Sequence, residues 1–564
     1  MMKTGAEILC ECLIKEGVEV IFGFPGGVLL PLYDTIPRYP RLRHILVRHE
    51  QGAAHAADAY ARVTGKLGVC LATSGPGATN LVTGIANAYL DSVPLLAITG
   101  QVPTHFIGKD AFQEIDITGI TVPITKHNQL VMDVNDLARA IHEAAYIAQA
   151  GRPGPVLVDI PRDVFQARTE FIYPEKVDLP GFKPKLFGHP SQVKKASDLV
   201  NSAERPVIVA GHGINISKAF TELKELAENA QIPVVTTFLG IGCFPESHVL
   251  SYGWLGMHGM GYANKAVHNS DLLLAVGMRF DDRATGGVST FAPNARVVHI
   301  DVDAAEIGKN IPVDVPIVGD LKNVLQVLNK QISRREHVAW LSQLDEWRSL
   351  HPATEVRNHE DILPQYIIRQ IHEATKGETI IVTGVGQAQM WAAQYFFYDR
   401  PNSFVSSGGL GTMGFELPGA IGAKVGCPQE TVWCIAGDGG FQMTVQELAT
   451  MVQEDLDINI AVFNNGWLGM VRQWQELIYN KRYFGTKLYN PDFVKIAEAY
   501  GIKGVKVSKK IDVRPAIHKA MEHKGPFLIE FMVEPEENVY PFVPPGKTIV
   551  EFLELPDPAA SLKK

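Results

Sequence analysis

Cysteine is scarce in this sequence and follows no recognisable pattern. The 564 residues include six Cys, and their spacing matches no metal-binding motif. Several of them, such as Cys70 and Cys434, lie within apolar runs. We therefore expect buried free thiols in a reducing compartment rather than disulfides, and the cytoplasm as the location.

Membrane spans, targeting segments and blocks of basic residues are also missing. The chain passes from Lys3 directly into a helix-like pattern, so neither a signal nor a transit peptide is expected. Residues 67–90 are uncharged over a membrane length, but Gly75, Pro76 and Gly77 interrupt them, which argues against a membrane helix. The net charge is −9, so neither nucleic acid nor an anionic membrane is an expected partner. A globular enzyme acting on small molecules fits better.

Length and hydrophobic pattern predict about three α/β domains, at roughly 150 to 200 residues each. Strand-like and helix-like runs alternate as in doubly wound parallel sheets over residues 1–170, 190–335 and 362–535. A linker rich in Pro, Lys and aromatics covers 169–189, and the proline-rich residues 536–564 form a tail that is a candidate lid. The predicted strands span 18–24, 44–48, 68–73, 94–99 and 155–160, then 206–210, 233–238, 272–276 and 296–301, and finally 379–383, 431–436, 458–463 and 527–533.

Polar side chains follow two neighbouring strands of the third run. Asp438 stands among glycines after strand 431–436, and Asn464 and Asn465 follow strand 458–463. Both groups would reach the carboxyl edge of the sheet, where ligands bind, and a helix from about Thr444 would direct its amides at an anion. Carboxylate, amide and main-chain carbonyl oxygens suit Mg²⁺ held together with phosphates. A turn that uses Gly, Asp and Asn only for their backbone angles is the alternative.

Glu50 lies where a predicted strand gives way to an Ala-rich helix. A glutamate in a first turn is favoured by the helix dipole alone. The functional alternative is a carboxyl in an apolar site that exchanges a proton with a ring nitrogen of a ligand. The residues by themselves leave both open.

Two turns of the middle run have the composition of a nucleotide site. Gly211 and Gly213 follow strand 206–210, although the third glycine of a GxGxxG is absent. Arg279 and Arg283 follow strand 272–276 and could bind phosphate. A structural turn and a surface ion-pair cluster are the respective alternatives.

The chain resembles the thiamine diphosphate enzymes in several motifs. They are RHEQGAAHAADAYAR (48–62), TSGPGATN (73–80), and GDG (437–439) followed by NN (464–465). The loop GKDAFQE (108–114) and the segment around Trp474 resemble acetohydroxyacid synthase (acetolactate synthase) in particular. The similarity covers nearly the whole chain and extends to a flavin-binding middle domain.

The resemblance implies a role for each motif. Glu50 would hydrogen-bond the cofactor's aminopyrimidine and favour the imino tautomer that deprotonates C2, while Met413 forces the cofactor into its bent shape. Asp438, Asn465 and the carbonyl of Trp467 would hold Mg²⁺ on the diphosphate. The Gly27 amide and the Gln113 side chain are candidates for polarising bound oxygens. The other thiamine diphosphate contacts would be Pro25, Gly75, Asn80, Gly386, Gln387, Gly411, Gly439, Gly440, Gly469 and Met470.

The resemblance also implies FAD, bound across the middle domain without an evident redox task. Phe112, Arg162 and Trp474 would contact substrate, and Trp474 would favour 2-oxobutanoate as the second substrate. Three positions depart from the family pattern, with Arg162 for the usual Lys, Ala388 for His and Glu416 for Gly. The FAD contacts would be Arg152, Gly211, Gly213, Met257, His258, Gly277, Arg279, Asp281, Arg283, Asp301 and Asp320.

The reaction implied is the first common step of branched-chain amino acid biosynthesis. Pyruvate is decarboxylated, and the hydroxyethyl carbanion/enamine attacks a second pyruvate or 2-oxobutanoate. Family members build each site from two subunits, so a homodimer or a dimer of dimers is expected, with a small regulatory subunit as a further candidate partner. A pyruvate oxidase or 2-oxo acid decarboxylase would share Glu50, Asp438 and Asn465. A non-catalytic flavin- or nucleotide-binding protein is the alternative of a different class.

Overall fold

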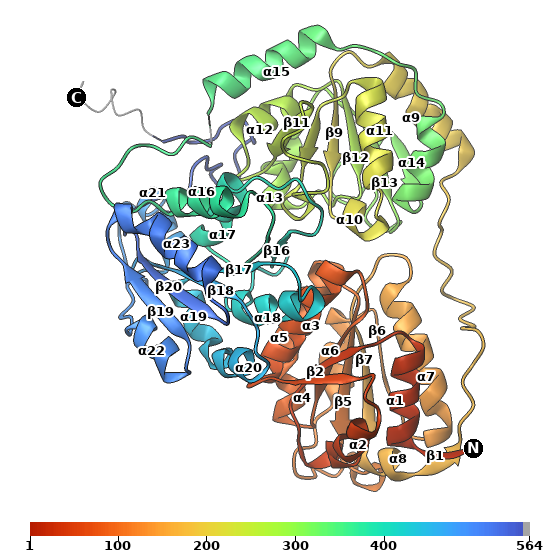
Figure 1. Ribbon diagram of the computed structural model, residues 1–564. Helices are drawn as coiled ribbons and strands as arrows, with labels where there is room; N and C mark the ends of the chain where they lie inside the picture. Colours follow the sequence, from red (N-terminus) through yellow and green to blue (C-terminus); the bar gives the residue numbers. More distant parts are fainter. Residues whose placement is uncertain (353, 556–564) are drawn as a thin grey trace.

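Three parallel sheets, each with helices on both faces, make up the chain (Figure 1). The structure is a computed structural model and describes residues 1–352 and 354–555. Each sheet has six strands, which confirms the predicted class of doubly wound α/β domains. A short antiparallel pair, β1 (Met2–Thr4) and β8 (Arg168–Glu170), joins the two ends of the first domain.

The first domain has the strand order β3-β2-β4-β5-β7-β6. The edge strand β6 (HNQL) was not predicted, because its residues are polar and only partly buried. The predicted helix over 78–90 is divided into two. The strands are β2 (Val20–Gly23), β3 (Arg43–Leu46), β4 (Gly68–Ala72), β5 (Leu95–Gln101), β6 (His127–Leu130) and β7 (Val156–Pro161); the helices are α1 (Gly5–Lys15), α2 (Leu30–Thr35), α3 (Glu50–Thr64), α4 (Pro76–Asn80), α5 (Val82–Leu90), α6 (Ile117–Thr121), α7 (Val134–Gln149) and α8 (Arg162–Gln166).

The middle domain has the order β11-β10-β9-β12-β13-β14, the arrangement of dinucleotide-binding sheets. A linker without helix or strand, residues 171–189, leads into it, as expected. The strands are β9 (Pro206–Ala210), β10 (Val234–Thr236), β11 (Ser251–Trp254), β12 (Leu272–Val276), β13 (Arg296–Asp301) and β14 (Val315–Val318); the helices are α9 (Pro190–Ser202), α10 (Gly213–Ser217), α11 (Phe220–Ala230), α12 (Gly261–His268), α13 (Asp282–Thr285) and α14 (Leu321–Asn329), followed by α15 (Val338–Leu350).

The third domain repeats the topology of the first, with the order β16-β15-β17-β18-β20-β19. Its edge strands β16 and β19 were not predicted; β19 (KGVKV) is half exposed. The strands are β15 (Ile380–Thr383), β16 (Phe404–Ser406), β17 (Val432–Gly437), β18 (Asn459–Asn464), β19 (Lys503–Val507) and β20 (Phe527–Met532); the helices are α16 (Pro364–Thr375), α17 (Gln387–Tyr395), α18 (Glu416–Gly426), α19 (Asp438–Met443), α20 (Leu448–Gln453), α21 (Gly469–Leu477), α22 (Phe493–Ala499) and α23 (Val513–Glu522).

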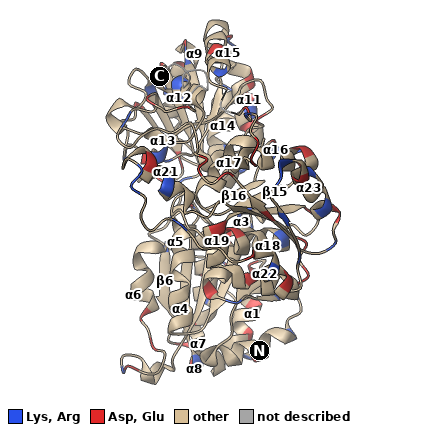
Figure 2. Cartoon of the chain, turned by 90° about the vertical axis from the view of Figure 1, so that its left-hand side faces the viewer, with Lys and Arg blue, Asp and Glu red and all other residues tan. Residues whose placement is uncertain are grey.

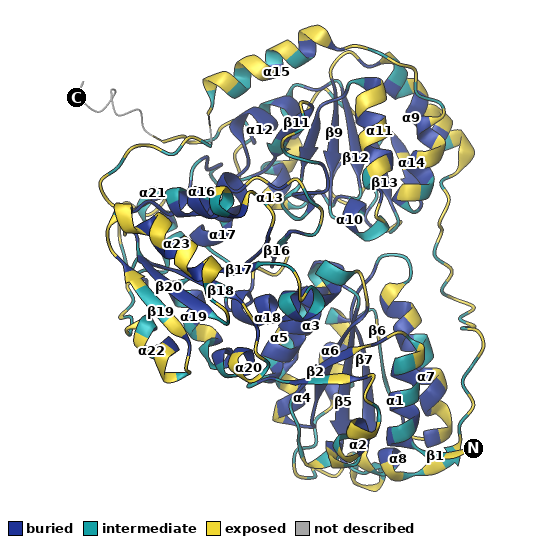
Figure 3. Cartoon of the chain, in the orientation of Figure 1, coloured by how far each residue is buried: buried dark blue, intermediate teal, exposed yellow. Residues whose placement is uncertain are grey.

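Helices α3 and α18 join the first and third domains, and Figure 3 shows both as largely buried. Their backbones approach closely, because a Cβ atom added at Gly422 would overlap the carbonyl oxygen of Ala56. Small residues along α3 permit this approach, and they are buried from Gly52 to Ala61. The Ala-rich composition of this segment therefore reflects helix packing.

The surface and the thiols agree with the composition. Lys, Arg, Asp and Glu are intermixed over the outer helices and loops (Figure 2). All six cysteines are free, and Cys427 alone among them is more than marginally exposed, so the prediction of free thiols is confirmed. None of the helices within residues 1–352 and 354–555 has the length and apolar character needed to cross a membrane.

Candidate active site

Asp438 is a buried acid at the carboxyl end of β17. It is 2% exposed, and its carboxylate accepts hydrogen bonds from the Gly439 N–H at 2.9 Å, the Gly466 N–H at 2.8 Å and Asn490 Nδ2 at 2.7 Å. Burial raises the pKa of Asp438 to about 6. All of these partners are neutral, so a bound cation would stabilise the ionised carboxylate.

The helix after β17 begins earlier than predicted. The sequence suggested a start near Thr444, whereas α19 begins at Asp438 and ends at Met443. The glycines after Asp438 do not delay the helix, because their main chain takes helical angles directly after the strand. A 3₁₀ turn, Val445–Glu447, does begin after Thr444, but the helix that starts at Asp438 itself is α19, which was not predicted.

Asn465 and Trp467 lie in the turn between β18 and α21. Asn465 Oδ1 accepts a hydrogen bond from the Trp467 N–H at 2.9 Å, so the amide oxygen and the main chain of Trp467 lie close together. Gly466, between them, donates its N–H to Asp438. The turn therefore places Asp438, Asn465 and the main chain of Trp467 in one cluster.

Sequence reasoning missed the residues that support this cluster. Asn490 Nδ2 donates to Asp438 and also to Asn464 Oδ1, at 2.8 Å. Asn464 in turn donates to the buried Glu530 at 2.7 Å. The only local signal was the dipeptide Asn490-Pro491, a common turn element, far along the chain from Asp438.

An open cradle of glycines adjoins the metal cluster. Gly386 and Gly411 have positive φ angles of 126° and 74°, which favour glycine, and a Cβ atom at Gly386 would meet no atom within 4 Å. A Cβ atom at Gly439 would lie 3.4 Å from the Met413 side chain. The predicted wedge residue thus borders the same space as the metal cluster.

Gln387 has an unsatisfied oxygen beside this cradle. Its Nε2 donates to Gln473 Oε1 at 3.0 Å and to the Glu537 carbonyl at 2.9 Å, while its buried Oε1 has no partner within the described chain. A Cβ atom at Gly469 would overlap this oxygen. Ala388, at the family's usual histidine position, is buried in the apolar core next to it.

The Glu416 side chain packs against glycines of the cradle. Its carboxylate accepts the Gly414 N–H at 3.0 Å, and Cβ atoms added at Gly384 or Gly440 would overlap it. Burial raises the pKa of Glu416 to about 7. This departure from the family pattern thus lies against the predicted diphosphate contact Gly440.

A second cluster surrounds Glu50 on the first domain. Glu50 is the first residue of α3 and is 7% exposed, and its Oε2 accepts a hydrogen bond from Asn80 Nδ2 at 2.9 Å. The hydroxyls of Thr73 and Ser74 are buried there without partners in the described structure. These unsatisfied polar atoms fit a polar ligand next to Glu50.

Three predicted residues border this second cluster. A Cβ atom at Gly75 would lie 2.9 Å from the Gln113 side chain, so the Gln113 loop packs on the turn after β4. Gln113 has a positive φ of 62°. A Cβ atom at Gly27 would meet no atom within 4 Å, so its surroundings, next to Pro25, are open.

The two clusters are not joined within one chain. No hydrogen bond in the part of the chain that the structure describes links Glu50 to Asp438, Asn465 or the Met413 loop. Phe112 is 89% exposed on its loop. Glu50 and Asp438 thus belong to separate hydrogen-bonded clusters, one on the first domain and one on the third.

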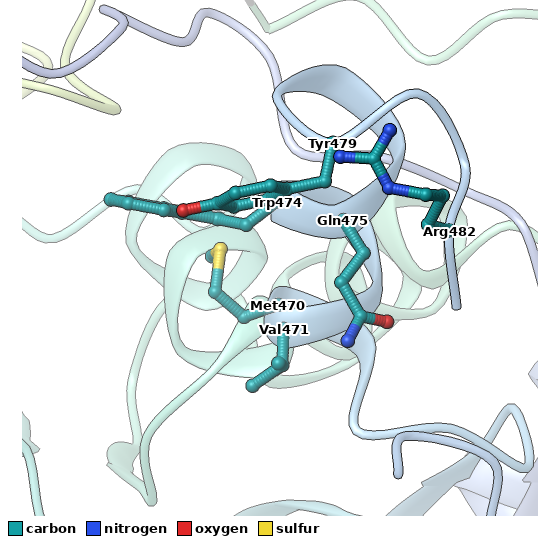
Figure 4. Close-up of a pocket in the computed structure, with 6 residues that line it drawn as sticks. All are labelled: Met470, Val471, Trp474, Gln475, Tyr479 and Arg482. Atoms are coloured by element: carbon teal, nitrogen blue, oxygen red, sulfur yellow. The ribbon is translucent and has the colours of Figure 1, made fainter. Parts of the chain in front are cut away.

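Trp474 lines a cavity of about 540 Å³ on α21, together with Met470, Val471, Gln475, Tyr479 and Arg482 (Figure 4). The Arg283 guanidinium of the middle domain lies 5.8 Å from the Trp474 ring centre. Phe542 of the tail packs edge-on against the same ring at 6.0 Å. Arg162 lies elsewhere, in a separate cavity of about 400 Å³ beside α2.

The tail lies against the middle domain as far as residue 555; residues 556–564 of the predicted tail lie outside the described residues. Val543 donates its N–H to the Met257 carbonyl at 2.9 Å, and the buried His258 pairs with the Pro541 carbonyl at 3.2 Å. Burial lowers the pKa of His258 to about 4, which favours its neutral form. Both residues therefore anchor the tail near Trp474.

Several predicted FAD residues lie at the carboxyl edge of the middle sheet, where the strand order reverses between β9 and β12. Gly213 donates its N–H to the Gly277 carbonyl at 2.9 Å, and a Cβ atom at Gly211 would overlap the same carbonyl. The buried Asn215 Oδ1 and Thr236 Oγ1 have no partners within the described residues. This edge therefore presents unsatisfied polar atoms with which a dinucleotide could pair.

The other predicted FAD residues have partners within the chain. Asp301, at the end of β13, accepts the Asp303 N–H at 2.8 Å, and burial raises the pKa of Asp301 to about 6. Asp281 and Asp320 cap α13 and α14, and Arg279 is half-buried beside them. Arg152 pairs with Asp303 at 3.2 Å and with Glu306 at 2.7 Å, so it connects the first domain to the middle one.

Comparison with known proteins accounts for all three domains. Residues 3–120 match the N-terminal TPP binding domain of thiamine pyrophosphate enzymes, 193–328 their central domain, and 384–531 their C-terminal TPP binding domain. The chain is thus an enzyme that depends on thiamine pyrophosphate, the predicted thiamine diphosphate.

Proteins of known name extend the match over nearly the full length. The acetolactate synthase large subunit of Corynebacterium glutamicum is 49% identical, over 97% of this chain and 89% of that protein. The probable acetolactate synthase large subunit of Methanocaldococcus jannaschii is 48% identical, over 98% of this chain and 95% of its own. An acetolactate synthase of Arthrospira platensis is also 48% identical, over 96% of both chains. The chain therefore belongs to the acetolactate synthase large-subunit family of thiamine pyrophosphate enzymes.

Proposed function

We propose that this chain decarboxylates pyruvate and joins the two-carbon fragment to a second pyruvate or to 2-oxobutanoate. The products are 2-acetolactate and 2-aceto-2-hydroxybutanoate, which lead to the branched-chain amino acids. The observation that carries the proposal is the buried Asp438, which has only neutral partners and borders an open glycine cradle. Such a site suits a divalent cation bound together with a diphosphate.

The third domain would hold Mg²⁺ and the diphosphate. Asp438, Asn465 and the Trp467 carbonyl are the proposed metal ligands, and Asn490 orients Asp438 through its hydrogen bond of 2.7 Å. The unsatisfied Gln387 Oε1 lies free for a polar contact. When bound, thiamine diphosphate supplies the electron sink for loss of CO₂.

The first domain would supply the proton-transfer group. Glu50 is held by Asn80 and is shielded from water, so its carboxyl can exchange a proton with a ring nitrogen of the cofactor rather than with solvent. Gln113 and the Gly27 amide stand on the open side of this cluster, where substrate oxygens would lie.

FAD is the third proposed cofactor. The reversal of strand order between β9 and β12 and the unpaired Asn215 and Thr236 atoms support a dinucleotide at this edge. The proposed decarboxylation and condensation involve no net oxidation or reduction, so we assign FAD a place in the fold rather than a step in the reaction.

Two subunits would complete each site. Glu50 and Asp438 lie in separate clusters of one chain, and Phe112 is exposed, so a second copy would bring the two halves together. We therefore propose a homodimer, or a dimer of dimers. The relatives from C. glutamicum and M. jannaschii are a large subunit and a probable large subunit, which supports a small regulatory partner for this chain.

Product analysis tests the proposal. The purified chain would be supplied with thiamine diphosphate, Mg²⁺ and FAD, first with pyruvate alone and then with 2-oxobutanoate added. We expect acetolactate, replaced partly by 2-aceto-2-hydroxybutanoate in the mixture, and no product from Glu50→Gln or Asp438→Asn. Acetaldehyde as the main product would indicate a decarboxylase instead, and peroxide with acetate or acetyl phosphate would indicate an oxidase.

A further inference from the structure

Glu447 is a fully buried acid that belongs to one domain and binds the other. It ends a short 3₁₀ turn of the third domain, Val445–Glu447, and is 0% exposed. Its Oε1 accepts the Arg48 N–H at 3.0 Å and the His49 N–H at 3.0 Å. These two amides belong to the first domain and directly precede Glu50. A buried carboxylate from one domain thus fixes the backbone next to the predicted proton-transfer residue of the other.

The carboxylate itself is held firmly. Thr450 Oγ1 donates to Glu447 Oε2 at 2.7 Å, and the Arg48 N–H lies 3.2 Å from the same oxygen. Hydrogen bonds to an ionised acceptor are shorter and stronger than those between neutral groups. Both oxygens therefore accept hydrogen bonds, which hold the side chain against the backbone of Arg48 and His49.

Gly52 makes room for this contact. A Cβ atom added at Gly52 would lie 2.6 Å from Glu447 Oε1, closer than real side chains approach. The Arg48 side chain adds a second connection between the domains, from its Nη2 to Gln453 Oε1 at 2.8 Å. The segment from Arg48 to Gly52 is thus built around the Glu447 carboxylate.

We propose that Glu447 is a positioning residue for Glu50. By binding two consecutive amides it sets the direction in which the chain enters α3, and with it the direction of the Glu50 carboxyl. The inference rests on the proposed role of Glu50. Glu447 touches neither substrate nor cofactor in this account, and acts only through the backbone of Arg48 and His49.

Matched variants can distinguish a specific effect of Glu447 on the position of Glu50 from a general effect of weakening the contact between the two domains. Glu447→Ala removes both acceptors, whereas Glu447→Gln keeps one oxygen for the two amides and can donate to Thr450. Glu454→Ala is the control, because Glu454 also joins the third domain to the first, through Arg43 at 2.9 Å, without contacting the segment around Glu50. Gly52→Ala pushes on the carboxylate from the opposite side and replaces Glu447→Ala if that variant does not fold.

The first measurement needs no cofactor. Amide hydrogen exchange of the peptide covering residues 46–52, followed by mass spectrometry in the cofactor-free protein, reports on the two amides directly. We expect exchange there to rise at least tenfold in Glu447→Ala or Gly52→Ala and to stay within about threefold of wild type in Glu447→Gln and Glu454→Ala. Unchanged protection in Glu447→Ala would overturn the inference.

The second measurement is the rate at which the C2 proton of bound thiamine diphosphate exchanges with deuterium, read by NMR after acid quench. A displaced Glu50 should slow this rate by roughly 10- to 100-fold in Glu447→Ala, since small misplacements of reacting groups have effects of that order. Glu447→Gln should stay near wild type, and cofactor affinity should change little in either. If Glu447→Gln is as slow as Glu447→Ala, charge rather than position is responsible and the inference fails.

Glu50→Gln distinguishes failure of the two proposals. If it exchanges C2 as fast as wild type, the proposed role of Glu50 is wrong. If it is slow while Glu447→Ala matches the Glu454→Ala control, the role of Glu50 stands and that of Glu447 is refuted.

Discussion

Replacing Glu416 with Gln should stabilise the protein in a way that depends on pH. Glu416 is 1% exposed, and burial raises its pKa from 4.5 to about 7. Because the folded-state pKa is the higher one, the unfolded chain loses this proton first as pH rises. Stability contributed by the protonated carboxyl is therefore full below about pH 4.5, declines up to about pH 7, and is absent above it.

The magnitude follows from this shift. A difference of about 2.5 pKa units corresponds to roughly 3 kcal/mol at pH 8. Gln keeps an oxygen for the Gly414 N–H but adds a buried NH₂ group, and leaving that group without an acceptor costs about 1 kcal/mol. A net gain of about 2 kcal/mol should raise the melting temperature of a domain this size by roughly 4–8 °C at pH 8.

The assay compares thermal unfolding of wild type and Glu416→Gln at pH 5 and pH 8, without cofactor. At pH 5 both side chains are neutral, so no gain is expected there. Thiamine diphosphate binding supplies a second test, since an ionised carboxylate against Gly440 opposes the diphosphate. The variant should bind the cofactor more tightly than wild type at pH 8 but not at pH 6. A melting shift of equal size at both pH values would refute the argument from ionisation.

Three further changes test other parts of the structure. Gly422→Ala should destabilise the protein by about 1–3 kcal/mol, because the added methyl overlaps the α3 backbone. Gly181→Ala is the control and should leave the melting temperature unchanged, because a Cβ atom there meets nothing within 4 Å. Equal shifts in melting temperature for the two variants would argue against close packing of α3 and α18. Asp438→Asn should weaken Mg²⁺-dependent cofactor binding by roughly 100-fold, since loss of a residue that only supports a metal ligand already costs 10- to 100-fold. Titration with Mg²⁺ at a fixed concentration of thiamine diphosphate measures this effect. An unaltered Mg²⁺ affinity would show that Asp438 is not a metal ligand. Trp474→Leu should lower the share of 2-aceto-2-hydroxybutanoate in mixed-substrate reactions several-fold while retaining acetolactate; an unchanged product ratio would show that the cavity on α21 does not select the second substrate.

The sequence predicted a strand well where burial of both faces of that strand determined its residues. Apolar strands buried on both faces were predicted closely, and 206–210, 272–276 and 296–301 match β9, β12 and β13 to the residue. Edge strands such as β6 and β19 escaped because one side faces solvent and the pattern becomes polar. Their pairing depends on neighbours that are distant along the chain.

The residues of the candidate site likewise differ in how far the sequence alone could predict them. Asp438 and Glu50 stand at strand ends with local signals, whereas Asn490 and Glu447 act through partners brought together only by folding. No spacing rule connects Glu447 to Arg48. The start of α19 at Asp438 was missed because glycines normally weaken a helix.

The shared strand order of the first and third sheets has a further consequence. Helix α3 lies between the second and third strands of its domain along the chain, and α18 occupies the same place in its own. The contact between them is therefore a pairing of equivalent elements, as in an isologous dimer, but made within a single polypeptide. The first and third domains are thus a covalently linked pair of related units, of which the proposed function gives one the proton exchange and the other the metal site. A symmetric pair of whole subunits would then repeat, between two chains, the pairing of equivalent elements that α3 and α18 already make within one chain.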